Sequence, residues 1–541
     1  MKARAMPRTV ELKGTAASRG IATGPLVAIA QGVERHRPQG DPPAERDDLQ
    51  KAVEQAAADL SRLVETLEED AAAVLEFQIA MLQDEELTGP VLDAIAAGEP
   101  AHSAWRQRLD AMMAEYAASE DEYFRAREAD IRDIRDRVLR VLGGANGQLA
   151  AAGAILVGDD ITPSRFLETD WSAGGGIVLA RGSASSHVAM LARSRAVPMV
   201  VGLGDIAPAL ASGHSLAILD GGAGTVLLSP DETHKRQYGL RLKAEAQVRQ
   251  REAESLFAPA RTADGVAISV QVNIADVAEL AQLDAAACDG IGLVRTEFLF
   301  GAGPELPDEE AQYGVYRRYL EWAGGKPVTI RTLDAGGDKP ITGLTLEGEA
   351  NSFLGLRGLR LSLARPEVFR VQLRALARAA AHGPLKVMFP MVTHPFEMDQ
   401  AVAAFDEALL ALQEAGVPCA RPALGMMVEV PAAAIAPEGF RADFLSIGSN
   451  DLVQYVTATA RDVTATSHLY DPAAPAVVGL IEGLARHGAG HGIEVSICGD
   501  IAGDPDYTSM LLGAGLRTLS VAPADLGRVK AAIAGLTLGR G

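Results

Sequence analysis

The chain has 541 residues, of which 48% are hydrophobic and 22% are charged, and its formal net charge is −21. These values are typical of a soluble globular protein with about two to four domains, and they exclude a chain that is disordered throughout. The acidic balance argues against a nucleic-acid-binding surface, and no apolar run reaches the roughly 18–20 residues needed for membrane insertion.

Cysteine usage and the N-terminal residues indicate the cellular compartment. Cys288, Cys419 and Cys498 show neither a disulfide framework nor CxxC spacing. The first residues, MKARAMPRTVELKG, are charged but lack the apolar segment of a signal peptide. We therefore expect a cytoplasmic protein in a reducing environment.

The N-terminal half predicts an α/β domain with a helical insertion. Its first residues combine short apolar runs with glycines, and a Pro- and charge-rich connector follows. Over the next ~95 residues apolar side chains recur every three or four positions, which favours a helical hairpin or small bundle. Short β-branched runs then return. We assign residues 1–30 and 145–230 to one α/β domain and residues 31–144 to an inserted α-helical bundle.

A charged, glycine-poor helical stretch, residues 231–258, leads into the C-terminal half. It fits a solvated connector and a hinge equally well. Over residues 259–541, eight strand-like runs alternate with helical patterns: ISVQVNI, GIGLVRTE, VTIRTLD, LKVMFPMV, LGMMVEVP, DFLSIGSND, EVSICGD and RTLSVAP. This alternation predicts a (β/α)8 barrel. The expected fold class is therefore multidomain α/β, with a C-terminal (β/α)8 TIM barrel.

Polar residues stand at the C-terminal end of most of these strands, where functional groups gather in this fold. They are, in chain order, Arg295, Glu297, Arg331, Asp334, Glu429, Asn450, Asp451 and Cys498. One such residue is usually an ordinary loop residue, but five strands that share the feature indicate one site. Paired arginines suit phosphate or carboxylate, and Glu429 with Asp451 would supply hard oxygen ligands for Mg²⁺. Arg357 and Arg461 add further cations. We expect a small phosphorylated acid bound with magnesium.

Cys498, in SICGD, allows two interpretations. A cysteine at a strand end is often a small buried residue without a chemical role. At a barrel mouth that holds an anion and a metal, its thiol could instead hand a proton to an enolate. Cys288 and Cys419 lack such a setting, and we interpret both as structural.

His187, in GSASSHVAMLAR, could be a packed histidine, a metal ligand or a nucleophile. No residues with zinc-like spacing accompany it, which disfavours a metal site. Ser185 or Ser186 can cap a helix that begins near His187. A helix N-terminus favours the neutral imidazole and would stabilise an attached phosphate. The local residues thus permit a phosphohistidine without establishing it.

Eleven motifs together resemble Enzyme I, the phosphoenolpyruvate–protein phosphotransferase family of the bacterial sugar phosphotransferase system. They are MLQDEEL, READIRDIRDRVLR, SSHVAMLARSRAVPMVVG, GIGLVRTEFLF, IRTLDAGGDKP, NSFLGLRGLR, VMFPMV, GMMVEVPAAA, SIGSNDLVQY, SHLYDP and CGDIAGD. The resemblance runs from TAASRGIATGPL to the C-terminus. Pyruvate,phosphate dikinases and phosphoenolpyruvate synthases share the histidine and barrel motifs, but they also carry a large ATP-grasp domain for which the helical insertion leaves no room.

The resemblance implies that His187 accepts the phosphoryl group of phosphoenolpyruvate on its Nε2 atom, in an α/β domain that swivels. The residues expected to bind the substrate are Arg295, Arg331, Arg357, Asn450, Asp451 and Arg461. Glu429 and Asp451 match the family's Mg²⁺ ligands, and Cys498 matches the acid that protonates the departing enolate to give pyruvate. Phosphohistidine would pass its group to the carrier protein HPr, which family members bind through the helical domain, and the chain would form a homodimer through the barrel.

The segment before His187 departs from the family pattern. The residues from Gly182 to Ser185 replace the usual two glycines and Arg-Thr pair, and Ala460 stands where an acid is common. Neither change removes a residue that the chemistry needs. Two other hypotheses remain: ATP-driven pyruvate phosphorylation, which the missing nucleotide domain opposes, and a non-catalytic regulatory relative, which the intact His187 and Cys498 oppose.

Overall fold

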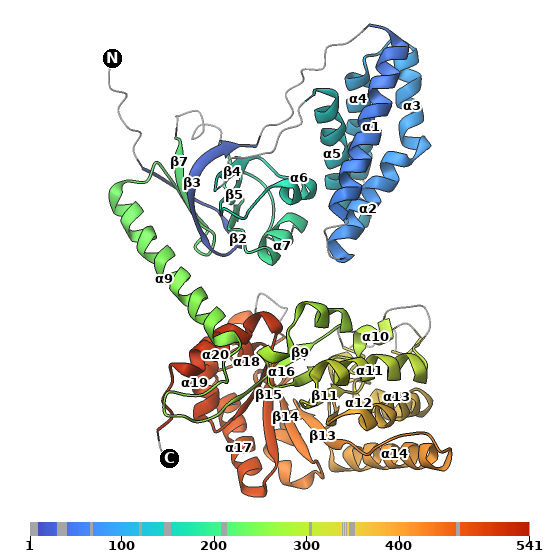
Figure 1. The fold of residues 1–541 in the computed structure, drawn as a ribbon, viewed down its shortest axis with the longest axis vertical. Helices are drawn as coiled ribbons and strands as arrows, with labels where there is room; N and C mark the ends of the chain where they lie inside the picture. The colour runs from blue at the N-terminus through green and yellow to red at the C-terminus, as the bar shows by residue number, and fades with distance from the viewer. Residues whose placement is uncertain are drawn as a thin grey trace. The chain divides into compact units, whose positions relative to one another are not determined.

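The computed structural model of the chain describes residues 9–29, 40–64, 69–117, 122–144, 153–184, 186–206, 214–301, 306–337, 339, 341, 343–345, 352–460 and 466–539. The chain divides into two compact units, Met1–Ala244 and Glu245–Gly541. Figure 1 labels the helices and strands of both units.

The first unit is built on an eight-stranded sheet in the order β1-β8-β7-β3-β4-β5-β6-β2. Its strands are β1 (Val10–Lys13), β2 (Thr15–Ser18), β3 (Ile21–Ala28), β4 (Ile155–Gly158), β5 (Gly176–Leu179), β6 (Met199–Val201), β7 (Leu216–Asp220) and β8 (Thr225–Leu228). The run from β3 to β6 is parallel, and the remaining pairs are antiparallel. Two short helices, α6 (Pro163–Glu168) and α7 (His187–Ser194), follow β4 and β5 and contact each other beside the sheet (Figure 1).

A helical bundle interrupts this sheet between β3 and β4, which are neighbouring parallel strands. It consists of α1 (Pro42–Val64), α2 (Glu69–Gln83), α3 (Glu85–Ala96), α4 (Ala101–Ala117) and α5 (Glu122–Leu142). In α1 the buried apolar residues Leu49, Ala52, Ala56 and Leu60 fall on one face, at the spacing that predicted a helix. The bundle shares one hydrophobic core with the sheet and with α6. The carboxylate of Asp133 in α5 accepts the hydroxyl of Ser164 in α6 at 2.6 Å.

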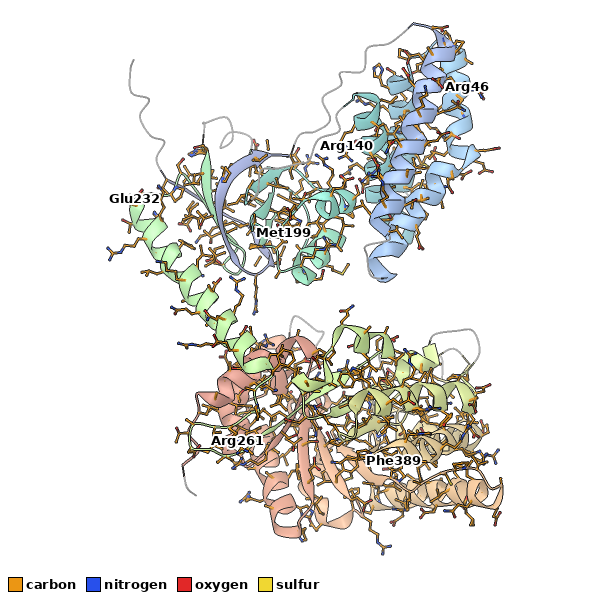
Figure 2. All side chains as sticks on the ribbon, in the orientation of Figure 1. Arg46, Arg140, Met199, Glu232, Arg261 and Phe389 are labelled. Carbon is orange, nitrogen blue, oxygen red and sulfur yellow. The ribbon has the colours of Figure 1, made fainter. Side chains whose placement is uncertain are left out.

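Helix α9 (Glu232–Leu256) connects the two units and contains no buried residue. Figure 2, where Glu232 is labelled at its start, shows its side chains projecting outward. Near its first turns, Arg241 Nη1 donates to Asp220 Oδ2 at 2.6 Å, within the first unit. Its last carbonyl, that of Leu256, accepts from Lys530 Nζ at 2.8 Å, within the second unit. Each end of the helix is therefore fastened to a different unit.

The second unit is a closed barrel of eight parallel strands, β10-β11-β12-β13-β14-β15-β16-β9, as the sequence predicts. The strands are β9 (Ser269–Ile274), β10 (Ile291–Val294), β11 (Val328–Arg331), β12 (Leu385–Phe389), β13 (Ala423–Val428), β14 (Phe444–Gly448), β15 (Glu494–Cys498) and β16 (Thr518–Val521). The helices are α10 (Glu297–Gly301), α11 (Glu309–Ala323), α12 (Leu359–Ala364), α13 (Pro366–Ala379), α14 (Pro395–Glu414), α15 (Pro431–Ile435), α16 (Ser449–Thr457), α17 (Pro475–His491), α18 (Asp500–Gly503), α19 (Pro505–Gly513) and α20 (Leu526–Ala534).

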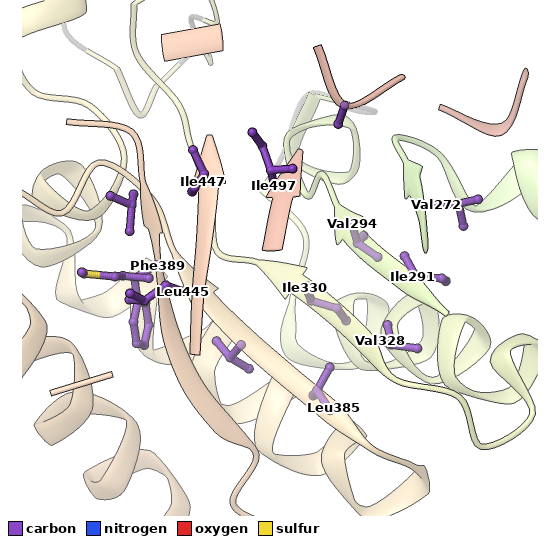
Figure 3. Close-up of a cluster of buried hydrophobic side chains, with 14 of the residues drawn as sticks. Val272, Ile291, Val294, Val328, Ile330, Leu385, Phe389, Leu445, Ile447 and Ile497 are labelled. Carbon is purple, nitrogen blue, oxygen red and sulfur yellow. The ribbon is translucent and has the colours of Figure 1, made fainter. Parts of the chain in front are cut away.

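The barrel has two sets of buried side chains. The larger set, which includes Val272, Ile330 and Phe389, packs with apolar residues of the surrounding helices (Figure 3). The smaller set consists of Leu293, Met388, Met427, Phe444 and Cys498. Because strand residues alternate between the two faces, the second set belongs to the barrel interior, directly below the polar strand ends. Within the described residues, no helix is both long and apolar enough to cross a bilayer.

Candidate functional site

The carboxyl ends of the barrel strands bring the predicted polar residues to one mouth, because all eight strands run in parallel. Arg331 is the last residue of β11, and Glu429 directly follows β13. Asn450 and Asp451 lie in the first turn of α16, which starts where β14 ends, and Cys498 is the last residue of β15. The side chains of Arg331, Glu429 and Cys498 are each at least 96% buried.

Asp334 lies at the centre of a charged network. Its carboxylate contacts Arg331 Nη1 at 3.2 Å, Arg357 Nε at 3.0 Å and Lys339 Nζ at 3.5 Å. The side chain is fully buried. Burial alone would raise the pKa of this carboxyl, but Arg331 and Arg357 outweigh burial and hold it well below its usual range. Asp334 is therefore ionised and fixes the position of two arginines.

Arg331 reaches from β11 across the mouth. Its Nη2 donates to Glu297 Oε2 at 3.0 Å, and its Nη1 lies 3.5 Å from the sulfur of Met427. Burial disfavours its charge, but Glu297 and Asp334 outweigh this and raise the pKa of the guanidinium above its ordinary value. Its Nε is buried and has no hydrogen-bond partner among the described residues. A buried, permanently charged group with an unused donor is suited to an anionic ligand.

Arg357 is held between two carboxylates. Besides Asp334, it donates from Nη1 and Nη2 to Asp451 Oδ1 and Oδ2 at 3.3 and 3.0 Å. Its side chain is 98% buried. This paired geometry fixes the carboxylate of Asp451 at the mouth. The structure thus shows Arg357 with its guanidinium engaged by protein groups.

Glu429 is buried at the carboxyl end of β13. Its Oε1 accepts the backbone N–H of Met391 at 2.6 Å. Met391 adopts φ of 57°, an uncommon left-handed conformation for a residue with a side chain, and this backbone directs the N–H at Glu429. Burial, with the nearby charges of Asp451 and Asp334, raises the pKa of the Glu429 carboxyl to about 8. A cation beside the Glu429 carboxylate would stabilise its ionised form and so lower this pKa.

The residues present fit a magnesium ion that also binds substrate. No group of three or more His, Cys, Asp or Glu side chains in the described part of the chain is arranged to hold a metal. Mg²⁺ is usually held by only one or two carboxylates, with phosphate oxygens and water in its remaining positions. Glu429 and Asp451 supply such a pair. Burial, with Asp451 and Asp334, outweighs Arg331 and Arg357 and raises the pKa of Glu429, so a bound cation would favour its ionised form.

Gly448 and Gly499 allow the strand ends to approach these side chains. A Cβ on Gly448 would lie 2.8 Å from Glu429 Oε2. Gly499 has φ of +99°, and a Cβ there would lie 2.1 Å from Ser449 Oγ and 2.7 Å from Asn450 Oδ1. The carbonyl oxygen of Asn450's side chain accepts the N–H of Asp500 at 2.9 Å, which orients the amide. Both positions therefore require glycine, because a side chain there would collide with residues of the site.

Cys498 presents a protonated thiol to the barrel interior. Its Sγ lies 3.5 Å from the carbonyl of Ile447 and donates to it. Burial raises the pKa of the thiol to about 11, although Arg331 and Arg295 act in the opposite direction. The thiol is therefore neutral and carries its proton throughout the physiological range. Arg295, which follows β10 and is half-buried, makes no ion pair within the described part of the chain.

The segment around His187 is only partly described. Helix α7 begins at His187, and the hydroxyl of Ser186 accepts the N–H of Ala189 at 3.2 Å, which confirms the predicted cap. Arg193 Nη1 donates to the carbonyls of Ala184 and Ala17 at 2.7 and 2.9 Å. Ser185, the side chain of His187, and Arg461 lie outside the residues that the structure describes.

Lys339 and Met391 were not predicted to lie at the mouth, whereas Glu297 and Asp334 were placed there without the ion pairs that they make with Arg331. Glu297 and Asp334 each stand within three positions of an arginine at a strand end, and this spacing was a usable signal for ion pairing. Lys339 is visible in IRTLDAGGDKP only as one more loop cation. The left-handed backbone of Met391 leaves no signal in the sequence.

The chain is similar to enzymes that use phosphoenolpyruvate. Three PEP-utilising enzyme family models match it: the N-terminal model over residues 13–127, the mobile domain over 150–224 and the PEP-binding domain over 249–538. A phosphoenolpyruvate-protein phosphotransferase of Cupriavidus necator is 37% identical, over 96% of this chain and 93% of the relative. One from Geobacillus stearothermophilus is 36% identical, over 94% and 91%. An NMR solution structure of Enzyme I is 25% identical, covers 43% of this chain and 99% of that chain, and has a TM-score of 0.37.

Proposed function

Because the chain belongs to the PEP-utilising enzymes, among the phosphoenolpyruvate-protein phosphotransferases, we propose that it moves the phosphoryl group of phosphoenolpyruvate to His187 and then to a histidine of the carrier protein HPr. Pyruvate is the second product, and the reaction is the first step of the sugar phosphotransferase system. The observation that carries the proposal is the barrel mouth, where fixed arginines, two carboxylates and a protonated thiol converge.

The arginines bind the anionic substrate. Arg295 has no ion pair in the described part of the chain, and Arg331 has an unused buried donor, so both can accept phosphate or carboxylate oxygens. Arg461 joins them by the family motif, and the N–H of Asp500, which donates to Asn450 Oδ1, fixes the orientation of the Asn450 amide. Arg357 contributes by holding Asp451 in place.

Glu429 and Asp451 would hold Mg²⁺, which, when bound, neutralises negative charge on the phosphoryl group and on the enolate oxygen. The arginines keep the phosphoryl group in line with the attacking nitrogen, and the P–O bond of phosphoenolpyruvate breaks as the P–N bond to His187 Nε2 forms. The enolate then takes the proton of the Cys498 thiol at its terminal carbon, which gives pyruvate. The thiolate recovers a proton from solvent.

Transfer requires His187 to reach the barrel mouth and later leave it, because the two lie in different units of the chain. We propose residues 1–30 and 145–230 as the phosphohistidine domain, residues 231–258 as the connecting helix and residues 259–541 as the phosphoenolpyruvate-binding domain. Helix α9 fits the role of a connector, because Arg241 fastens one end to the first unit and Lys530 fastens the other to the second. Residues 31–144 would bind HPr, in keeping with the family resemblance.

The barrel also offers a surface for a homodimer. Four connections in succession, those after β11, β12, β13 and β14, each carry a large apolar residue that is more than half exposed; these residues are Leu354, Phe396, Ile435 and Leu469. Ile435→Glu is expected to shift the protein to a monomer in analytical ultracentrifugation. Leu410→Glu is the control, because Leu410 is 55% exposed but lies in the second half of α14, whereas Phe396 lies in the first turn of that helix. Equal dimer fractions in both variants would remove this surface as the interface.

The function is tested by incubating the protein with radiolabelled phosphoenolpyruvate and Mg²⁺. We expect an acid-labile label on the wild-type chain, none on His187→Ala, and loss of the label to HPr when HPr from the same source is added. Label retained by His187→Ala would refute the assignment of the acceptor. Formation of AMP from ATP and pyruvate would favour the dikinase reaction instead.

A further inference from the structure

An open hollow lies on the sheet of the first unit, apart from the barrel. It has a volume of about 690 Å³ and is lined by Ala16, Ala17, Ser18, Arg19, Arg193, Ala196, Gly221 and Gly222. Two of these eight residues are arginines, none is acidic, and the others are small. Hollows of roughly 300–1,000 Å³ are the usual size for small-molecule sites. The composition indicates an anionic ligand.

Two turns form a fixed wall of this hollow. Gly221 donates its N–H to the carbonyl of Gly20 at 2.8 Å. A Cβ on Gly221 would lie 2.0 Å from the carbonyl oxygen of Ser18, so the two turns meet backbone to backbone. Because this contact leaves no room for a side chain, the turn that carries Arg19 is held against the turn between β7 and β8. The hollow is therefore preformed.

Arg193 has a free edge for an oxyanion. Its Nη1 uses both of its hydrogens, one for the carbonyl of Ala17 and one for that of Ala184. Its Nε and Nη2 make no hydrogen bond among the described residues, and these two atoms form the fork that binds phosphate or carboxylate through two parallel bonds. Arg193 can therefore hold an anion without releasing either carbonyl.

The buried carboxylate of Asp220 does not neutralise the charge at the hollow. Asp220 directly precedes Gly221, but its Oδ2 accepts from Arg241 at 2.6 Å and its Oδ1 accepts the N–H of Ala223 at 3.0 Å. Arg19 is exposed and makes no ion pair within the described part of the chain. The two arginines of the hollow thus keep their charge available for a ligand.

We propose that this hollow binds the phosphate or carboxylate group of a small anionic molecule between Arg19 and Arg193. Binding fixes Arg193, and through the carbonyl of Ala184 it also stiffens the segment that precedes His187. The site goes beyond phosphoryl transfer, since neither arginine takes part in the proposed chemistry. Because the binding is measured directly, it can be tested whether or not His187 is the phosphoryl acceptor.

The test is calorimetric titration of the full-length chain with inorganic phosphate and, in a second arm, with citrate, at matched ionic strength. Arg19→Gln is expected to weaken one binding event at least about tenfold, since it removes a charge-assisted pair. Arg195→Gln is the control. Arg195 is an exposed arginine at the C-terminal cap of α7, the helix that contains Arg193, but it does not line the hollow. Anion binding at the barrel mouth is expected to be the same in the wild type, Arg19→Gln and Arg195→Gln, so it does not account for a difference in affinity among them.

The two arms distinguish the sources of the anion: phosphate binding that depends on Arg19 indicates a phosphorylated ligand, and citrate binding that depends on Arg19 indicates a carboxylate. Hydrogen exchange should slow in peptides covering residues 182–187 when the anion binds to the wild type, and not in Arg19→Gln. Equal affinities of the wild type and Arg19→Gln in both arms would overturn the proposal. So would Arg195→Gln weakening the binding as strongly as Arg19→Gln.

Discussion

Replacing Glu429 with glutamine should stabilise the metal-free protein at alkaline pH and abolish its response to Mg²⁺. Glu429 is 99% buried beside Asp451, and the two carboxylates repel each other when no cation is bound. A glutamine at this position can still accept the N–H of Met391 through its side-chain oxygen, because it has the shape of the glutamate. The substitution therefore removes a buried charge and keeps the hydrogen bond.

The magnitude follows from the pKa of about 8, compared with an ordinary value of 4.5. Because folding raises this pKa, the contribution of Glu429 to the free energy of unfolding is fully present below about pH 4.5 and is lost as the pH rises through about 8. Ionised Glu429 thus lowers the free energy of unfolding by roughly 3–5 kcal/mol above pH 8, because each unit of pKa difference corresponds to about 1.4 kcal/mol. The glutamine variant avoids this cost. Its melting temperature should therefore equal that of the wild type near pH 4.5 and exceed it by several degrees at alkaline pH.

The assay is thermal unfolding of the full chain near pH 5 and pH 8.5, with and without Mg²⁺. Glu297→Gln serves as the control, because Glu297 is paired with Arg331 at 3.0 Å and its loss should destabilise the protein at both pH values. Mg²⁺ should raise the melting temperature of the wild type but not of Glu429→Gln. A lower melting temperature for metal-free Glu429→Gln at pH 8.5, or a preserved Mg²⁺ response, would refute the reasoning.

Three further predictions concern the same mouth. Gly448→Ala should raise the Mg²⁺ concentration needed for half-maximal activity about tenfold or more, since its Cβ would lie 2.8 Å from Glu429 Oε2. Gly479→Ala is the control, because a Cβ at Gly479 would have nothing within 4 Å. Similar Mg²⁺ requirements for both variants would contradict this prediction. Cys498→Ala should lower the rate of pyruvate release about 10²–10⁴-fold with little change in phosphoenolpyruvate affinity, and an unchanged rate would exclude the thiol as the acid. Asp334→Asn should cost about 3–5 kcal/mol in urea unfolding because it leaves two buried arginines undercompensated, and a change below about 1 kcal/mol would argue against its central place.

The barrel could be predicted from the sequence because each of its strands is covered by helices on one side and fills the interior on the other. Such strands are mostly apolar, with single polar residues such as Lys386 in LKVMF of β12 and Ser446 in FLSIG of β14, and helical patterns separate most of them. The polar residues that follow these runs could also be assigned to one mouth, since parallel strands place their carboxyl ends together. The capped start of α7 at His187 was predictable from the small polar residues before it.

The pairing pattern at the mouth could not be predicted in the same way. Arg357 and Asp451 are 94 positions apart, and no local pattern selects that partner rather than a solvent-facing one. The result is that Arg357, expected to bind substrate, has its guanidinium engaged by Asp334 and Asp451. The φ of Met391 is likewise set by tertiary contacts, because its N–H meets Glu429 only when the barrel closes.

A single-turnover experiment tests most directly whether the barrel mouth delivers its phosphoryl group to His187. The full-length protein is mixed with Mg²⁺ and substoichiometric labelled phosphoenolpyruvate, and pyruvate and protein-bound label are measured in the same quenched samples. We predict that the two appear at the same rate and in equal amounts, and that neither appears with His187→Ala. Pyruvate release without protein-bound label, or label on a chain that lacks His187, would contradict the proposed transfer.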